Sequence, residues 1–189
     1  MLIEEIYHTK APIKIWSTPL GVPKEYRDEL VKATYKQKQN APRTDAFYDV
    51  FNEENGRVIA TSPNAWEDIP LYNELLNGIQ TKFQEIIYKD KDWGGGIINY
   101  QITSAWSGLY EEGQIAKPHH HIPSYFSFCY YMKAEAPYTP MVFDEVNISI
   151  NAVTDRIIFF PSWVSHSVPP VKAERIFISG NMVGTSMQQ

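Results

Sequence analysis

From residue 97 to residue 183 the sequence consists of short apolar or alternating runs, and no helix-length amphipathic segment interrupts them. Turn-forming residues separate the runs at a spacing typical of an antiparallel sandwich or jelly roll, whereas a parallel α/β sheet would place helices between them. The predicted strands are residues 97–110, 125–133, 140–143, 147–151, 156–160, 165–171 and 175–183. The second half of the chain is therefore expected to form a β-barrel-like core.

The first ninety or so residues show helical patterns instead. Residues 23–39 begin with proline and acidic residues, carry apolar residues at near-helical spacing and end with lysines, which predicts a helix. Residues 70–89 place a continuous apolar stripe on one helical face, which is expected to pack on a sheet. Between them, residues 40–69 are polar and turn-rich, which indicates a mobile flap with a short strand near residues 57–61.

The chain of 189 residues fits one domain of the α+β class, mainly β. We expect residues 1–96 to supply helical support and the flap, and residues 97–184 to form the core, with the helices packed on one sheet. The formal charge of −5 and the pI near 5.5 provide no general attraction for phosphate backbones or anionic lipids. Nucleic acid and membrane surfaces are therefore not expected as partners.

Cys129 is the only cysteine, so the chain cannot form an internal disulfide, and its aromatic neighbours predict a buried core residue. The N-terminal residues are acidic where a secretory signal would be basic, and no apolar run is long enough to span a bilayer. These features favour a reducing, cytoplasmic location.

Four of the five histidines lie at two places, the run His119-His120-His121 and His166. Side chains two apart on an extended strand point the same way, so His119 and His121 can face one metal while His120 points away. Imidazole suits iron, nickel, copper and zinc. A solvated histidine loop is the alternative for the run, and a structural histidine at the rim of the core is the alternative for His166.

Arg175 follows His166 by nine residues and opens the apolar strand Ile176-Phe177-Ile178. An arginine at the start of a buried strand is costly unless its guanidinium pairs with an anion. That anion could be a bound ligand, or it could be a carboxylate of the chain such as Glu145 or Asp155.

Three segments of this sequence resemble the 2-oxoglutarate-dependent Fe(II) oxygenases, in particular the prolyl-hydroxylase-like branch and a short-chain family from bacteria and phages. The segments are PHHHIPSYFSFCYYM, DRIIFFPSWVSHSVPPV and ERIFISGN, and the resemblance covers roughly residues 98–183. It implies a double-stranded β-helix that binds Fe(II), 2-oxoglutarate and O2 and hydroxylates a substrate with release of succinate and CO2.

By this resemblance His119 is the first iron ligand, His166 is the distal ligand and Arg175 binds the far carboxylate of 2-oxoglutarate. His121 stands where the superfamily has an acidic ligand, but the short-chain family commonly carries histidine there as well. Three imidazoles remove one negative charge from the iron ligands, which should weaken Fe(II) binding. Asp144 on a neighbouring strand is the alternative third ligand.

The resemblance also assigns hydroxyl groups around the co-substrate. Tyr131 and Ser179 match residues that hydrogen-bond its carboxylate, and Tyr110 matches a further tyrosine of that pocket. The apolar walls that exclude water are expected from the following residues: Phe126, Phe128, Phe159 and Phe177.

The substrate, a protein or a small molecule, is expected to contact the less regular residues 42–66 and 111–118, and the resemblance suggests an amino-acid side chain such as a prolyl residue. Two other functions remain open at this point. One is a cupin-like three-histidine metalloenzyme that does not use 2-oxoglutarate. The other is a non-catalytic β-sandwich that binds a partner, with a structural zinc.

Overall fold

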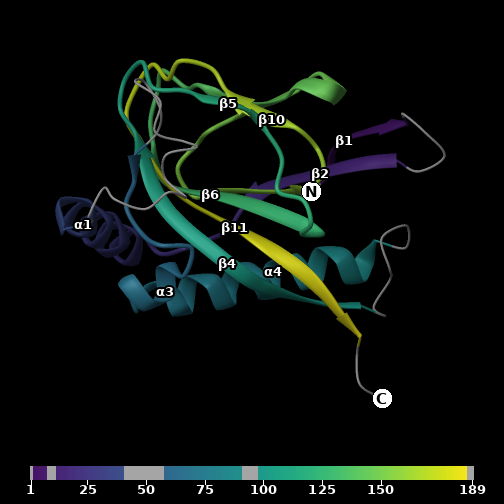
Figure 1. The fold of residues 1–189 in the computed structure, drawn as a ribbon, viewed down its shortest axis with the longest axis horizontal. Helices are drawn as coiled ribbons and strands as arrows, with labels where there is room; N and C mark the ends of the chain where they lie inside the picture. The colour runs from purple at the N-terminus through teal and green to yellow at the C-terminus, as the bar shows by residue number, and fades with distance from the viewer. Residues whose placement is uncertain (1, 8–11, 41–57, 91–97, 187–189) are drawn as a thin grey trace.

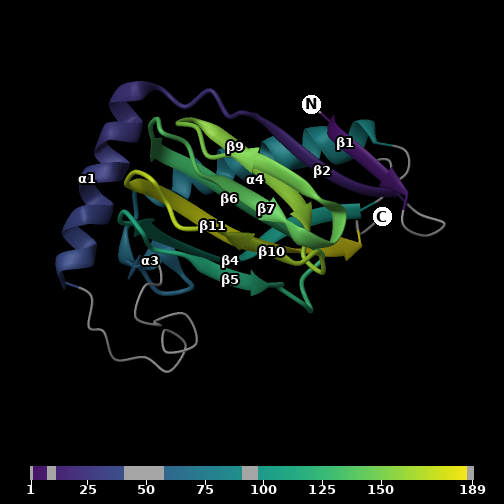
Figure 2. The same cartoon turned by 90° about the horizontal axis from the view of Figure 1, so that it is seen from above.

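The computed structural model describes residues 2–7, 12–40, 58–90 and 98–186, which form two antiparallel sheets and the helices that cover one of them (Figure 1). The larger sheet has seven strands in the order β1 (Leu2–Tyr7), β2 (Pro12–Pro19), β9 (Arg156–Pro161), β6 (Phe126–Ala134), β11 (Arg175–Ser186), β4 (Ile98–Tyr110) and β3 (Val58–Ile59). The smaller sheet has four strands in the order β5 (Ala116–His119), β10 (His166–Val168), β7 (Pro140–Phe143) and β8 (Ile148–Asn151). Seen from above, β5, β10 and β7 overlie β4, β11 and β6 (Figure 2).

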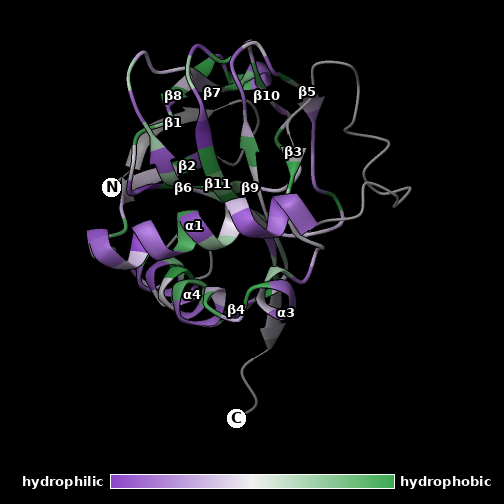
Figure 3. Cartoon of the chain, turned by 90° about the vertical axis from the view of Figure 1, so that its left-hand side faces the viewer, coloured by the Kyte–Doolittle hydropathy of each residue, from purple (hydrophilic) through white to green (hydrophobic). Residues whose placement is uncertain are grey.

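The helices are α1 (Lys24–Asn40), the short α3 (Ala65–Asp68) and α4 (Tyr72–Lys89), with a 3-10 turn η2 (Asp144–Val146) between β7 and β8. α1 and α4 lie on the face of the larger sheet that points away from the smaller sheet (Figures 1 and 3). Most of α1 is hydrophilic in Figure 3, in agreement with only Leu30 and Thr34 being fully buried on it. The predicted packing of N-terminal helices on one sheet is confirmed.

α4 supplies most of the apolar contact beneath the larger sheet. Phe83 lies 4.9 Å from Phe126 and 5.0 Å from Phe159, measured between ring centroids, and all three rings are buried. Burying one such side chain contributes on the order of 2 to 3 kcal/mol. Ile79 and Ile87 extend the same stripe along the helix, so its periodicity determines where α4 lies on the sheet.

A second core fills the space between the two sheets. Because successive strand residues point to opposite faces, β6 directs Phe126 and Phe128 to the helices, while Cys129 and Tyr131 point to the smaller sheet. β11 alternates in the same way, with Phe177 between the sheets. Functional side chains of the larger sheet are therefore confined to alternate positions on its strands.

Both predicted helices and all seven predicted strands of the second half are present, with bounds shifted by a few residues at most. β3 matches the short strand predicted near residues 57–61, whereas residues 41–57 of the predicted flap lie outside the described residues. The expectation that residues 111–118 are irregular is wrong for residues 116–118, which belong to β5.

Strands β1 and β2 are absent from the sequence-based prediction. β2 pairs with β9 in antiparallel register, with Trp16 opposite Phe159 and Pro19 opposite Arg156. Its alternating Ile13 and Ile15 are both buried between the sheets, and this alternation was the available signal. In the part of the chain that the structure describes, we find no helix with the length and apolar character needed to cross a membrane.

Candidate metal centre and buried arginine

His119 and His166 face each other across a strand pair. His119 is the last residue of β5, His166 is the first residue of β10, and the antiparallel register places them directly opposite each other. Their ring centroids are 4.4 Å apart, as expected for cross-strand neighbours. A pairing of residues 47 positions apart in the sequence thus brings two imidazoles to one point.

His121 reaches the same point from a turn. The expectation that it shares a strand with His119 is wrong, because β5 ends at His119. The His121 N–H donates to the Ser162 carbonyl at 2.7 Å, and the His121 carbonyl accepts from the Ser124 N–H at 3.1 Å. Its ring lies 5.5 Å from that of Trp106 at an angle of 32°. These contacts fix His121 with its Nε2 3.3 Å from Nε2 of His166.

The three imidazoles form one group whose potential ligand atoms all lie within 4.8 Å of one another. His166 is buried and the other two are half-buried. Nδ1 of His119 lies 2.7 Å from the Lys117 carbonyl, and Nδ1 of His166 lies 3.3 Å from the Val164 carbonyl. Since a carbonyl only accepts, Nδ1 carries the proton in both rings and Nε2 presents its lone pair. The three histidines therefore form a group that could hold a metal ion.

The other candidate ligands lie outside this group. His120 is exposed, in agreement with its predicted outward direction. Asp144 is exposed on η2, where its Oδ2 accepts a hydrogen bond from Ser167 at 3.0 Å. Of the described residues, only His119, His121 and His166 form a group that could hold a metal ion at this point, and Asp144 is not part of it.

Arg175 is buried, with an exposed fraction of 2%. Its Nη1 donates to the Thr139 carbonyl at 2.7 Å, whereas Nε and Nη2 have no hydrogen-bond partner within the described ranges. A salt bridge to Glu145 or Asp155 is not formed, because Glu145 is exposed and Asp155 pairs with Arg27. Leaving buried donors of a cation unsatisfied costs several kcal/mol, so an anion that reached these two nitrogens would be stabilised.

Two tyrosines enclose the guanidinium. Cζ of Arg175 lies 4.5 Å from the ring centroid of Tyr110 and 5.3 Å from that of Tyr131. Burial raises the pKa of the Tyr131 hydroxyl well above its ordinary value, the Cys129 thiol adds to this, and Arg175 opposes it. The Tyr131 hydroxyl thus stays protonated, and among the described residues it has no hydrogen-bond partner. It is a neutral donor that points into the space beside Arg175.

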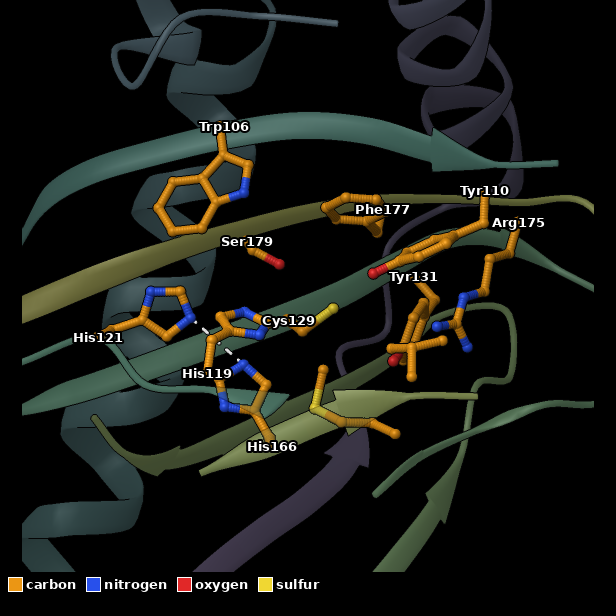
Figure 4. A pocket seen from close by; sticks show the side chains of 12 residues that line it. Trp106, Tyr110, His119, His121, Cys129, Tyr131, His166, Arg175, Phe177 and Ser179 are labelled. Carbon is orange, nitrogen blue, oxygen red and sulfur yellow. Dashed lines mark hydrogen bonds between the residues drawn. The ribbon is translucent and has the colours of Figure 1, made fainter. Parts of the chain in front are cut away.

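Histidines, arginine and hydroxyls share one pocket between the sheets (Figure 4). Arg175, Tyr110 and Tyr131 close one end of it, Ser179 lies in the middle, and the histidines lie at the other end. The sequence-predicted site residues are thus brought together. The lining residues are Trp106, Tyr110, His119, His121, Cys129, Tyr131, Met141, His166, Val168, Arg175, Phe177 and Ser179.

The predicted apolar walls are mostly wrong. Phe126, Phe128 and Phe159 point to the helices, and only Phe177 lines the pocket. The walls also include Trp106 and Met141, together with Cys129, which the sequence suggested to be a plain core residue. Strand alternation could have found Trp106, four residues before Tyr110, and Cys129, two residues before Tyr131.

The free volume of the pocket is about 20 Å³, which is room for about one water molecule. A five-carbon diacid would therefore have to move the lining side chains apart. Met141 is the most adaptable of them because its unbranched thioether chain repacks at low cost. The donor set, three imidazoles and a buried guanidinium, fits a metal and a carboxylate.

Two antiparallel sheets that face each other, with a histidine group and a buried arginine between them, define a double-stranded β-helix, or jelly roll. No protein-family model matches this sequence, and no curated protein matches it either. Solved structures do match this chain, and three prolyl hydroxylases are among the most similar.

A viral collagen prolyl hydroxylase from Paramecium bursaria Chlorella virus-1, solved with 2-oxoglutarate, has a TM-score of 0.60 and 16% identity over 89% of this chain and 94% of its own. A prolyl hydroxylase from Trichoplax adhaerens, solved with a peptide of the hypoxia-inducible-factor oxygen degradation domain, has a TM-score of 0.67 and 15% identity over 89% and 83%. A Pseudomonas putida prolyl-4-hydroxylase has a TM-score of 0.60 and 14% identity over 89% and 91%.

These likenesses confirm the resemblance to prolyl hydroxylases at the level of the fold. One fold hosts many reactions, so the reaction must be argued from the site residues.

Proposed function

We propose that this protein is a non-haem Fe(II) and 2-oxoglutarate-dependent oxygenase that hydroxylates a substrate with release of succinate and CO2. The observation that carries the proposal is the buried Arg175, whose guanidinium has two nitrogens without a hydrogen-bond partner among the described residues, in the same pocket as three converging imidazoles. A metal site by itself needs no such cation. An anion that binds beside the metal needs a fixed cation of this kind.

In this proposal His119, His121 and His166 hold the iron, and Arg175, Tyr131 and Ser179 hold the far carboxylate of 2-oxoglutarate. Bound iron and co-substrate together supply the activation of O2 and the electrons that it needs. Arg175 contributes a charge-assisted pair to the carboxylate, and Tyr131 donates a neutral hydrogen bond to it. Tyr110 covers the guanidinium with its ring, which keeps water from competing for the cation.

The apolar surroundings of the histidines strengthen these interactions. His166 packs against Phe160 and Phe143, with ring centroids at 4.6 Å and 6.0 Å. Low polarity around the site increases the electrostatic attraction between a bound cation and an anion. A reducing, cytoplasmic setting is part of the proposal, supported by the single buried thiol of Cys129.

The three-imidazole donor set would equally suit a metalloenzyme that does not use 2-oxoglutarate. That alternative supplies no anion for Arg175, and neither does a non-catalytic module with a structural zinc. Binding of 2-oxoglutarate therefore separates the three functions.

The test is a calorimetric titration of Mn(II)-loaded protein with 2-oxoglutarate, together with an assay for succinate release in the presence of Fe(II). Arg175→Ala should weaken binding about 100-fold, since it removes about two charge-assisted hydrogen bonds of roughly 1.5 kcal/mol each. Arg156→Ala is the matched control, because Arg156 lies on β9 outside the pocket and donates to Ser17. Absence of 2-oxoglutarate binding to metal-loaded wild type would refute the proposed function.

A further inference from the structure

The alternation along β11 continues by one position beyond the residues that line the pocket. Arg175, Phe177 and Ser179 line the pocket, so the next side chain on that face is Asn181. Gly180 points to the helices instead, because a Cβ there would lie 2.6 Å from ring atoms of Phe128. Two residues span about 6.8 Å of an antiparallel strand, which places Asn181 beyond Ser179 on the side away from Arg175.

Asn181 belongs to a row of uncharged polar side chains that crosses the larger sheet. The register pairs Asn181 with Ser104 on β4 and with Ser127 on β6. Ser127 donates to Oδ1 of Asn181 at 2.9 Å, and Nδ2 of Asn181 donates to Ser104 at 3.2 Å. Ser162 extends the row, with its hydroxyl 2.7 Å from that of Ser127. We call Ser104, Asn181, Ser127 and Ser162 the polar row.

The polar row lies at the metal end of the pocket. The Ser162 carbonyl holds the backbone of His121, and Ser104 lies two residues from Trp106, whose ring packs against His121. The opposite end is closed by the buried Arg175 and its two tyrosines. A co-substrate that joins Arg175 to the metal occupies the closed side, so a substrate must approach from the side of the polar row.

The row changes from buried to accessible along its length. Ser162 and Ser127 are buried, with exposed fractions of 0% and 1%, whereas Asn181 and Ser104 are half-buried. The primary amide of Asn181 keeps one N–H and one oxygen lone pair beyond the bonds already described. The Ser104 hydroxyl accepts from Asn181, and in the described part of the chain its own proton has no acceptor. The accessible half therefore offers both donors and an acceptor, and no charge.

We propose that Asn181 and Ser104 bind an uncharged amide group of the substrate next to the C–H bond that is oxidised. A planar amide presents one N–H and one C=O, which match the free acceptor and donors of Asn181 and Ser104. The amide belongs either to a small molecule or to a polypeptide backbone. The inference rests on the proposed function for the reaction, but amide binding is measurable without turnover.

The probes are N-acetyl amino-acid N-methylamides and the corresponding N-acetyl methyl esters, in which an oxygen replaces the N–H. Calorimetry on Zn(II)-loaded wild type, with and without 2-oxoglutarate, should show a preference for amide over ester of about fivefold to tenfold, the value of one hydrogen bond. Asn181→Ala should abolish the preference. Ser104→Ala should weaken the binding of amide and ester alike, because both probes keep the carbonyl that the Ser104 hydroxyl would contact.

Asn151→Ala is the matched control, because Asn151 is exposed on β8 in the smaller sheet. Thermal melting of each variant shows whether the fold is kept, and Ser104→Ala removes only one half-buried hydroxyl. Affinity that rises with peptide length assigns the amide to a polypeptide, and affinity confined to single-residue amides assigns it to a small molecule. Both results support the inference.

Wild type that binds none of the amides, or an unchanged amide preference in Asn181→Ala, overturns the inference. The proposed function fails separately, on the absence of 2-oxoglutarate binding. A merely structural polar row would lower the melting temperature in Asn181→Ala without changing the ratio of amide to ester affinity.

Discussion

His119 and His166 are oriented by the same kind of contact. In each, Nδ1 faces the backbone carbonyl of the residue two positions earlier in the chain. The carbonyl fixes the ring and its tautomer, so that the lone pair of Nε2 points to the centre of the group. His121 is oriented differently, by its backbone bond to Ser162 and by the ring of Trp106. Neighbouring histidines thus differ in orientation, and the exposed His120 does not belong to the group.

Replacing single histidines should separate ligands from bystanders. We expect His119→Ala and His166→Ala to weaken Co(II) binding by at least about 100-fold, more than the loss of a supporting contact around a metal. His120→Ala should bind Co(II) as wild type does, because the side chain of His120 is exposed. The measurement is the visible absorption of bound Co(II) during titration. Equal damage from His120→Ala and His119→Ala would contradict the arrangement of the site.

Among the elements, α4 is held by a buried tyrosine hydroxyl as well as by its apolar stripe. Its first residue, Tyr72, is fully buried and lies with its hydroxyl 2.5 Å from Oγ1 of Thr34 on α1 and 3.7 Å from Sδ of Met132 on β6. Burial raises the pKa of Tyr72 to about 12. A single hydroxyl thus links two helices to the larger sheet.

This tyrosine should make stability fall at alkaline pH. In the unfolded chain Tyr72 titrates near its ordinary pKa of about 10, so above pH 10 the unfolded state binds fewer protons than the folded state. The contribution of Tyr72 to the free energy of unfolding is present below pH 10 and is lost by about pH 12. This loss amounts to about 3 kcal/mol. Urea unfolding from pH 9 to 12 should show a shallower decline for Tyr72→Phe than for wild type.

Tyr72→Phe should also cost about 1 kcal/mol at neutral pH, the value of one buried hydrogen bond. Tyr88→Phe is the control, because Tyr88 lies on the same helix with 67% of its surface exposed. If both variants followed the pH profile of wild type, Tyr72 would not contribute to the alkaline loss of stability.

Glycine has opposite effects on stability in α4 and in β11. A Cβ at Gly78 of α4 would meet nothing within 4 Å, so Gly78→Ala should raise the free energy of unfolding by about 0.5 to 1 kcal/mol. At Gly180 of β11 a Cβ would lie 2.5 Å from the Ser104 carbonyl oxygen. Gly180→Ala should destabilise by about 1 to 3 kcal/mol, because the sheet backbone must shift. Chemical denaturation of both variants checks this, and a stabilised Gly180→Ala would contradict the packing described.

On the scale of the whole molecule, the pocket is made by the approach of two sheets. The histidines belong to the smaller sheet and the turn after it, whereas Arg175, Tyr131 and Ser179 belong to the larger sheet. A ligand that touches both groups would connect the sheets. Binding to the folded state alone stabilises it in proportion to the logarithm of ligand concentration.

Metal should therefore raise the melting temperature of the whole chain. At 100 times the dissociation constant we expect a gain of about 2.7 kcal/mol, or a rise of roughly 5 to 10 °C for a chain of this size. Addition of 2-oxoglutarate to metal-loaded protein should give a further rise, which Arg175→Ala should lose. Scanning calorimetry with and without a chelator measures both steps. An equal rise in His166→Ala would show that the metal binds elsewhere.

The sequence by itself determined the two long helices, the strands after residue 97 and the candidate site residues, but not strands β1 and β2. Helix and strand periods depend on neighbours in the chain, so residues 24–40, 72–89 and the strands after residue 97 were readable. The spacing of His119, His166 and Arg175 was readable for the same reason. Tertiary structure decided what each face of a strand touches. It placed β2 beside β9, and it directed Phe128 to the helices and Cys129 to the pocket. It also placed Asp144 outside the histidine group and left Arg175 without a carboxylate among the described residues. These outcomes depend on contacts between distant segments, and no local pattern in the sequence encodes which segments meet.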